Sequence, residues 1–275
     1  MKYVVLFMFL LWTAISDAQP ENSHWNGQQL ELGKTYYTFA DNLTLRAKPD
    51  ASGDKIALLP VNTAVTIEAI SKSVITVNGI ALPWVQVTAN GKKGYLASGL
   101  ISLARLPFNN DSHLLYIRVN SNTRDEYAQQ ISFRLAGNNT YRELGTFDLQ
   151  NLSFAVNVYD NRGLTGIDHV IQVDYLAESC GEEGGLSYFT FSTKTGDFNS
   201  LGYFSSVGDA DVYHKIERLI FPNDEHGNQG MIIYSGEEGS YLDDNDSEYR
   251  TVQKVREYAW QDGKLVTPIV KFVYN

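Results

Sequence analysis

Short alternations of apolar and polar residues dominate the chain, and they predict β-strands almost throughout. "AVTIEAI", residues 64–70, alternates along its length, and "VITVNGIALPWVQV", residues 74–87, places two strand-like runs on either side of Asn78-Gly79. Alternation with a period of two puts one set of side chains on each face of a strand. Asn-Gly favours the tight turn of a hairpin, and a second copy follows at Asn90-Gly91. Residues 34–102 therefore predict about five short strands in a small barrel.

Residues 113–275 continue this pattern on a larger scale. The chain between the two regions, residues 103–112, contains Pro107 and a polar run, which together predict a linker. Beyond it, Lys194–Asp197 and Gln261–Lys264 are turn signals between apolar runs. We predict strands at LLYIRV, QISFRL, YRELGTFDL, FAVNVY, HVIQVDYL, LSYFTFS, SLGYFSS, KIERLIF, GMIIYSG, TVQKVREYAW and KLVTPIVKFVY.

Helices should be few, because no long stretch sustains the apolar spacing of three and four residues that a helix needs. Residues 125–130, "DEYAQQ", fit a single helical turn. The sequence therefore predicts an all-β fold, in which a small barrel precedes a larger β-rich domain built as a sandwich or as a partial, propeller-like array. The propeller alternative comes from two Gly-Glu-Glu-Gly units, at 181–184 and 236–239, whose offset is near the length of one blade. Two acidic hairpin loops would explain the repeat equally well.

Residues 1–18 have the order of a secretory signal peptide. Lys2 supplies a positive charge, residues 4–15 are apolar but too few to span a bilayer, and Ser16-Asp17-Ala18 ends in a small-residue cleavage site. We predict cleavage before Gln19, a secreted or periplasmic location, and a flexible arm at residues 19–33. The alternative is an uncleaved N-terminal helix. No later stretch is apolar enough to span a membrane, so we do not expect an integral membrane protein.

Composition narrows the classes of partner. The net charge is −10 and the isoelectric point is about 4.9, so the surface should repel phosphate backbones and we expect no nucleic-acid binding. Aromatic residues make up 12% of the chain, with 17 Tyr, which suits half-buried sheet faces.

Cys180 is the single Cys, so an internal disulfide is excluded and packing has to provide stability. A small buried or loop thiol explains Cys180 better than pairing between chains.

Four motifs follow one another in residues 34–102. They are "LTLRAKP" from Leu43, "LPVN" from Leu59, "WVQV" from Trp84 and "NGKKGYL" from Asn90. In this order they resemble the bacterial Src-homology-3 (SH3) domain, whose pattern is Leu-Asn-Val-Arg with a following Pro, then Leu-Pro-x-Gly, Trp-x-x-Val and Asn-Gly-x-x-Gly-Tyr-Val. Asn62 replaces the Gly of the second motif, a mild departure because Asn tolerates a positive φ. The resemblance covers about a quarter of the chain.

The resemblance implies a module that binds peptidoglycan peptides or other cell-envelope ligands. It also implies that Arg46 supports a turn by hydrogen bonds to carbonyl groups. We name Tyr95 as the centre of the ligand-binding face, with Tyr37 as a second platform and Trp84 as a further candidate, because exposed rings stack on peptides and sugars. Tyr95 and Trp84 also suit the core of a small barrel, and for Trp84 we favour the core. Residues 73–83 lengthen a loop beside the family's groove and could cover it.

No catalytic motif can be named. A papain-like peptidase, which often accompanies this domain, needs a Cys at a helix N-terminus, but two Glu residues and no helical pattern follow Cys180. The five His residues lack zinc-binding spacing. Acidic clusters at 182–183, 237–238 and 243–248 could hold Ca²⁺, although solvated acidic loops explain them more simply. We therefore predict no catalytic residue, no metal site and no cofactor.

The leading hypothesis is a secreted cell-envelope protein without enzymatic activity. Its SH3-like module would bind a peptidoglycan-type peptide or glycan, and its C-terminal β domain would bind a second ligand or partner. A cell-envelope hydrolase, with an unrecognised active site in the C-terminal domain, is the alternative from another class.

Overall fold

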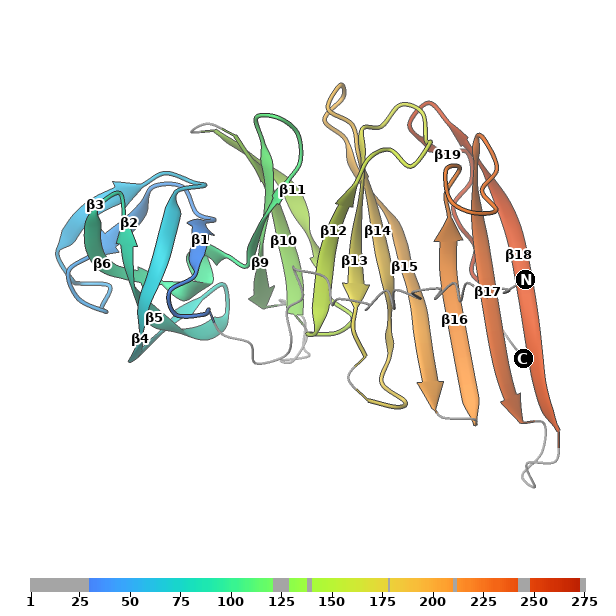
Figure 1. Cartoon of the computed structure of the whole chain (residues 1–275), viewed down its shortest axis with the longest axis horizontal. Helices are drawn as coiled ribbons and strands as arrows, with labels where there is room; N and C mark the ends of the chain where they lie inside the picture. Colours follow the sequence, from blue (N-terminus) through green and yellow to red (C-terminus); the bar gives the residue numbers. More distant parts are fainter. Residues whose placement is uncertain are drawn as a thin grey trace, which may run out of the picture.

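The computed structural model describes residues 30–120, 129–137, 140–177, 179–209, 212–241 and 248–272. Within these ranges the protein is all-β, as predicted, and its strands form antiparallel sheets of seven, four and eight strands (Figure 1). The described helical structure is one 3-10 turn, η1, at Ser98–Leu100. The predicted signal peptide, most of the predicted arm, residues 125–128 of the predicted helical turn and residues 243–247 of the acidic run lie outside the described residues.

The seven-stranded sheet is formed by the region that resembles an SH3 domain. Its strand order is β3-β2-β6-β5-β4-β1-β7, and it curls around a core of Leu, Val and Ile side chains that includes Leu45, Ile67 and Val87. The strands are β1 (Thr35–Thr38), β2 (Leu43–Arg46), β3 (Lys55–Leu59), β4 (Ala64–Val77), β5 (Ile80–Ala89), β6 (Lys92–Ala97) and β7 (Ile101–Ser102).

Two predicted hairpin turns in this sheet have the expected backbone. Asn78 and Gly79, between β4 and β5, have φ values of 52° and 78°, and Asn90 and Gly91, between β5 and β6, have φ values of 49° and 73°. Positive φ at both central residues fits a type I′ turn, whose twist matches the flanking strands. Asn62 also has a positive φ, 62°, which is why Asn can stand in for the Gly of the family's motif.

The remaining strands form two sheets. The four-stranded sheet has the order β11-β10-β9-β8, and the eight-stranded sheet runs from β12 to β19 in sequence order. Because neighbours in the sequence are neighbours in one sheet, the strands are not divided among propeller blades. Their bounds are β8 (Ala104–Pro107), β9 (His113–Asn120), β10 (Gln129–Ala136), β11 (Tyr141–Asp148), β12 (Phe154–Tyr159), β13 (His169–Tyr175), β14 (Gly184–Phe191), β15 (Phe198–Asp209), β16 (Tyr213–Ile220), β17 (Met231–Tyr241), β18 (Tyr249–Gln261) and β19 (Lys264–Leu265).

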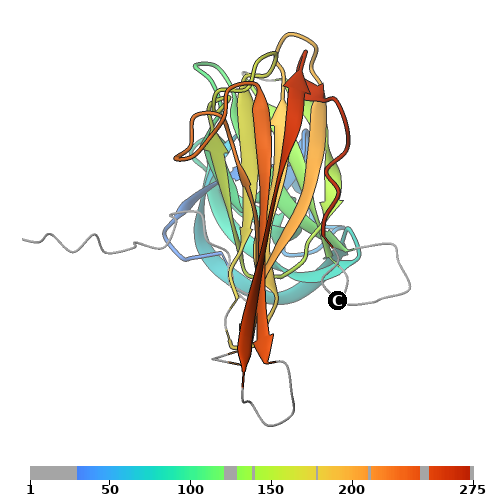
Figure 2. The same cartoon turned by 90° about the vertical axis from the view of Figure 1, so that its right-hand side faces the viewer.

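The four-stranded sheet packs on the first strands of the eight-stranded sheet, so this part of the molecule is a sandwich. Their shared core is rich in aromatic rings: Phe133 of β10 lies edge-on to Phe189 of β14, at 5.7 Å between ring centroids, and Phe189 stacks on Phe198 of β15 at 5.4 Å. Farther along, β16, β17 and β18 continue beyond the sandwich, and Figure 2 shows the β17–β18 hairpin extending past the other strands.

A second core joins the seven-stranded sheet to the four-stranded sheet. Phe39 and Val61, in the connections that follow β1 and β3 of the first, pack against Leu115, Ile117 and Ala136 from the second, and all five side chains are buried. We call these residues the junction cluster. Leu103 alone separates β7 of one sheet from β8 of the next. The predicted linker at residues 103–112 therefore contains a strand, because Ala104–Pro107 pairs with β9.

Two further stretches differ from their predicted form. Of the two Gly-Glu-Glu-Gly units, the first lies in the β13–β14 connection and runs into β14, but the second lies inside β17, so they are not equivalent hairpin loops. In the last predicted strand, residues 264–274, Lys264–Leu265 is the strand that the structure describes. Pro268 has no backbone N–H to donate to a strand ladder, and the following residues instead contact side chains on the eight-stranded sheet.

Candidate functional site

Tyr95 lies in the middle of the outer face of the curled sheet. The strand register aligns it with Arg46 of β2 on one side and with Gln86 of β5 on the other, and Arg46 in turn aligns with Lys55 of β3. The Tyr95 side chain is half-buried, and the Gln86 Nε2 donates a hydrogen bond of 3.2 Å to its hydroxyl. Tyr95 is therefore held in place while part of its ring remains at the surface.

The side chains around Tyr95 are mostly basic. Arg46 and Lys55 occupy the same cross-strand row, and Lys93 lies two residues before Tyr95 on the same face of β6. The Arg46 Nη1 donates to the Gly53 carbonyl oxygen at 2.8 Å, so it supports the turn as the resemblance implied. A guanidinium has five N–H donors, so others remain for a ligand.

The other two predicted ligand-binding residues lie elsewhere. Trp84 is buried, with 4% of its surface exposed, which agrees with the core role that we favoured for it. Tyr37 lies on β1, which β5 and β4 separate from the strand of Tyr95. Its ring is half-buried beside the junction cluster, and the Arg105 guanidinium lies 4.6 Å from the ring centroid. The structure thus does not bring the three residues into one site.

The long segment at residues 73–83 is a hairpin formed by the end of β4 and the start of β5. The Asn78 carbonyl oxygen accepts a hydrogen bond of 2.8 Å from the Asn120 backbone N–H, and Gly79 lies against the Asn120 side chain. Asn120 is the last residue of β9, so the hairpin tip contacts the neighbouring sheet. This contact directs the extra length of the hairpin toward the four-stranded sheet.

Comparison with known proteins gives one match. Residues 41–102 match the family model of the bacterial SH3 domain. This part of the chain is similar to the bacterial SH3 domain. No curated protein and no solved structure matches the chain. The SH3 domain suggests a module that binds the cell wall, and its outer face around Tyr95 is the candidate site for that binding.

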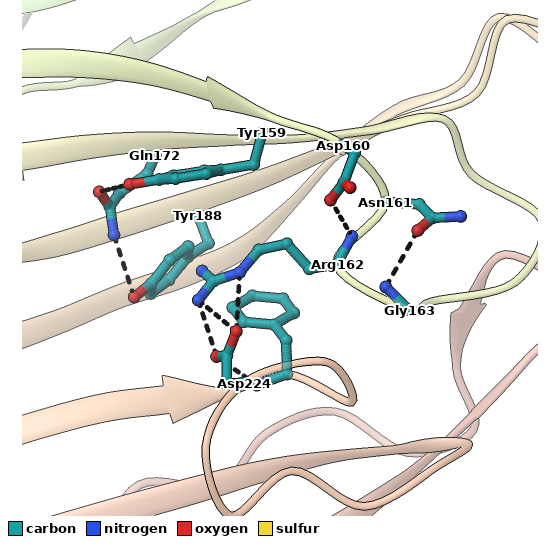
Figure 3. A network of polar contacts seen from close by, with 9 residues as sticks. Tyr159, Asp160, Asn161, Arg162, Gly163, Gln172, Tyr188 and Asp224 are labelled. Carbon is teal, nitrogen blue, oxygen red and sulfur yellow. Dashed lines mark hydrogen bonds and ion pairs between the residues drawn. The ribbon is translucent and has the colours of Figure 1, made fainter.

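A polar network lies at one end of the eight-stranded sheet (Figure 3). Arg162, in the β12–β13 loop, donates from Nη2 to both carboxylate oxygens of Asp224 at 2.7 Å, and its guanidinium lies 4.3 Å from the ring centroid of Phe221. Nearby, the Tyr159 hydroxyl donates to Gln172 Oε1, and Gln172 Nε2 donates to the Tyr188 hydroxyl.

The partners in this network satisfy one another, which indicates a structural role. Asp224 also accepts a hydrogen bond of 2.8 Å from the backbone N–H of Phe221, so the Arg162 pair fixes the β12–β13 loop to the β16–β17 loop. Bidentate pairs of this kind hold geometry as well as contributing energy. We interpret the network as a clamp between two loops.

His214 makes a small network on the face of β16–β18. Its Nε2 lies 2.9 Å from Glu237 Oε1 and its Nδ1 lies 2.6 Å from the Tyr249 hydroxyl. Gly239 lies beneath the imidazole, where a Cβ would come within 2.3 Å of the His214 Cε1. Cys180 is exposed in the turn before β14, so a strand follows it and no helix N-terminus acts on its thiol.

The two acidic residues of the first Gly-Glu-Glu-Gly unit have partners in the chain. The Asn151 amide donates to Glu182 at 2.7 Å, and the Tyr203 hydroxyl donates to Glu183 at 3.0 Å. Over the part of the chain that the structure describes, no group of three or more His, Cys, Asp and Glu side chains could hold a metal ion. In the same residues, no helix has the length and apolar character to cross a membrane.

The sequence motifs did not point to several residues that lie at the candidate sites. Gln86 and Lys93 flank Tyr95, and their positions follow from strand pairing that two Asn-Gly turns specify. Pairing the strands outward from the Asn90-Gly91 turn would place Gln86 opposite Tyr95 and Lys93 on the same face. The polar residues at 109–112 were assigned to the linker, and the contacts that the structure gives them involve strands β10 and β11, which no local signal joins to that loop.

Proposed function

We propose that the SH3 domain binds a carboxylate-bearing peptide of the peptidoglycan type, through the outer face centred on Tyr95. The single observation that carries this proposal is the cross-strand row in which Tyr95 is flanked by Arg46 and Lys55 on one side and by Gln86 on the other. An aromatic ring, basic groups and an amide together suit a peptide that presents a methyl or methylene surface and a free carboxylate.

The charge of this face differs from that of the whole chain. The chain carries a net charge of −10, yet Arg46 aligns with Tyr95, Lys55 aligns with Arg46, and Lys93 lies two residues before Tyr95 on the same strand. A local basic surface can attract a carboxylate at short range, whereas the acidic remainder limits non-specific binding of anionic polymers. The proposed ligand is therefore a small acidic peptide and not a long polyanion.

We further propose that the protein acts outside the cytoplasm, secreted or in the periplasm, as a non-enzymatic binding protein. The order of charge, apolar run and small residues in residues 1–18 supports this location. A module of this kind would hold its partner near the wall through weak and reversible contacts. Dissociation constants in the micromolar to millimolar range correspond to about −8 to −4 kcal/mol.

The experiment is a titration of the full chain from Gln19 with a synthetic peptidoglycan stem peptide, followed by calorimetry or by NMR chemical shifts. We expect Tyr95→Ala to weaken binding roughly three- to tenfold, because an aromatic contact contributes about 0.5–1.5 kcal/mol beyond its burial. Tyr95→Phe should keep most of the affinity. Binding should also weaken as salt is raised, because basic side chains contribute to it.

Tyr249→Ala is the matched control, since Tyr249 is also a partly exposed Tyr on a strand but lies on β18. It should bind like the unmodified protein. No binding at millimolar peptide, or equal binding by a folded Tyr95→Ala protein, would contradict the proposal. A response to the disaccharide alone, without the peptide, would show that the face binds glycan instead.

A further inference from the structure

A groove of about 660 Å³, with both polar and apolar groups in its lining, lies at one end of the four-stranded sheet, outside the SH3 domain. It forms where the β8–β9 loop lies beside the end of β10 and the start of β11, because His113 at the start of β9 pairs with Ala136 at the end of β10. The volume is within the range of small-molecule sites. The groove is lined by Asn109, Asn110, Asp111, Ser112, Leu135, Gly137, Thr140, Tyr141 and Arg142.

The groove contains polar groups that the described residues leave without partners. The Ser112 Oγ is buried and has no hydrogen-bond partner among the described residues. Over the same residues, the side chains of Asn110 and Asp111 are exposed and make no hydrogen bond or ion pair. Buried polar groups are almost always paired, so an unpaired hydroxyl in a groove indicates a site for water or for a ligand.

Tyr141 gives the groove an aromatic surface that is fixed in place. The Arg134 guanidinium lies 4.2 Å from its ring centroid on one side, and the same guanidinium lies 4.3 Å from the ring centroid of Phe39 in the junction cluster. Arg134 is held in turn by Glu143, at 2.6 Å, and by the Phe39 carbonyl oxygen. Tyr141 nevertheless remains 43% exposed, so a ring surface is available to a ligand without the cost of ordering the side chain.

Arg142, which follows Tyr141 in the lining, contacts a loop of the eight-stranded sheet. Arg142 extends from β11 to the β14–β15 turn, where its guanidinium lies so close to Gly196 that a Cβ at that position would overlap it. Arg142 and Asp111 contribute opposite charges to the lining, so the groove has no strong preference for an anion or a cation. Its remaining polar groups are amides and hydroxyls.

From these observations we infer that the groove is a binding site for a neutral oligosaccharide. Sugar hydroxyls both donate and accept hydrogen bonds, and amide, hydroxyl, carboxylate and guanidinium groups together supply both kinds of partner. The C–H face of a sugar ring packs on an aromatic ring, which Tyr141 provides. The site lies outside the SH3 domain and does not depend on the function proposed for Tyr95.

The test uses the full chain from Gln19 and two probes, chitotetraose with its N-acetyl groups and cellotetraose, in calorimetric titrations. At least one probe should bind with a dissociation constant below about 10 mM. Tyr141→Ala should weaken that binding roughly five- to tenfold, and Tyr141→Phe should change it less than about threefold. Asn110→Ala should also weaken it, and this variant removes a side chain that supports no neighbour among the described residues.

The controls separate this site from the SH3 face. Tyr95→Ala should bind the sugar normally, because its ring belongs to another sheet. Failure of both sugars to bind would overturn the inference. So would unchanged binding in both Tyr141→Ala and Asn110→Ala, or a groove that responds to an acidic peptide and to neither sugar. Because Tyr141 stacks on Arg134, thermal unfolding should accompany each titration, and Asn110→Ala decides the outcome if Tyr141→Ala does not fold.

Discussion

Glu217 on β16 is buried, with 2% of its surface exposed. Partners from three parts of the chain stabilise its carboxylate. Ser205 donates to it from both its backbone N–H and its hydroxyl, and the Tyr234 hydroxyl donates at 2.6 Å. The Lys271 Nζ, from the segment after β19, lies 3.1 Å away. Burial alone would raise the pKa of Glu217, but these hydrogen bonds and the Lys271 charge together lower it below its ordinary value.

A lowered carboxyl pKa makes folding stability depend on pH in one direction. The stabilisation by Glu217 is fully present above its ordinary pKa of 4.5 and is lost as the pH falls through the lowered value in the folded protein. We therefore expect Lys271→Met to lower the free energy of unfolding by about 1–3 kcal/mol at pH 7, because it leaves a buried charge with fewer partners. Denaturant unfolding at pH 7 and at pH 3 measures the difference.

The loss in Lys271→Met should shrink as the pH falls below 4.5, because protonation of Glu217 removes the charge with which Lys271 pairs. Lys264→Met, an exposed Lys on β19, serves as a control and should change stability little at either pH. An equal loss at both pH values would show that Lys271 acts through packing on Tyr203 and Phe204, over whose rings its Nζ lies, and not through the ion pair.

At the scale of elements, the junction cluster decides whether the SH3 domain and the sheets after it unfold together. We retain residues 34–102 and 113–275 as two proposed folding units, joined by the packing of Phe39 on Leu115 and Ile117. Phe39→Ala should remove about 3–5 kcal/mol from the stability of the protein, because it leaves a cavity at the interface. It should also separate one cooperative calorimetric transition into two.

Scanning calorimetry of the full chain and of Phe39→Ala tests this coupling. Two transitions already present in the unmodified protein would mean that the junction is too weak to couple the units. A single transition in both proteins would mean that other contacts, such as the hydrogen bonds of Ser102 to Ala104 and Tyr116, are sufficient.

The sequence predicted those parts of the molecule that depend on near neighbours. Asn78-Gly79 and Asn90-Gly91 specify their own turns, and alternating residues specify strands, so the all-β fold and the hairpins of the SH3 domain follow directly. The strand predicted at residues 264–274 shows the limit. In place of strand pairing, the Phe272 ring packs on Tyr234 and the Tyr258 hydroxyl donates a hydrogen bond to the Val270 carbonyl oxygen, while the Val266 and Val270 side chains remain exposed.

At the candidate site, too, local features could be predicted from the sequence and contacts between distant segments could not. Tyr95 was selected because its motif is local, and its surface position then depended on strand order. Tyr37 was selected as an aromatic residue near the same motifs, but Arg105, from the strand after the SH3 domain, covers part of its ring. The groove beside Tyr141 lies between the β8–β9 loop and the adjoining ends of β10 and β11, and no pattern within one segment indicates that these parts meet.

At the scale of the whole molecule, the proposed extracellular role requires processing of the N-terminus. We predict that the mature protein begins at Gln19, because the small residues before it are typical of a signal peptidase site. Intact-mass measurement of protein from the culture medium or the periplasm should show the loss of residues 1–18. A mature species that retains Met1, found in the cytoplasm, would contradict both the cleavage and the location.

The single residue between β7 and β8, together with the buried junction cluster, leaves little freedom between the SH3 face and the sheets that follow. If the Tyr95 face binds a wall peptide and the groove binds a sugar chain, the distance between the two contacts is fixed by the protein. A polymer that presents peptide and sugar at that distance would meet the second site at an effective concentration on the order of millimolar, whereas one with another repeat would gain almost nothing. Two weak sites would then select a wall polymer by the distance between its peptide and sugar groups as well as by their chemistry.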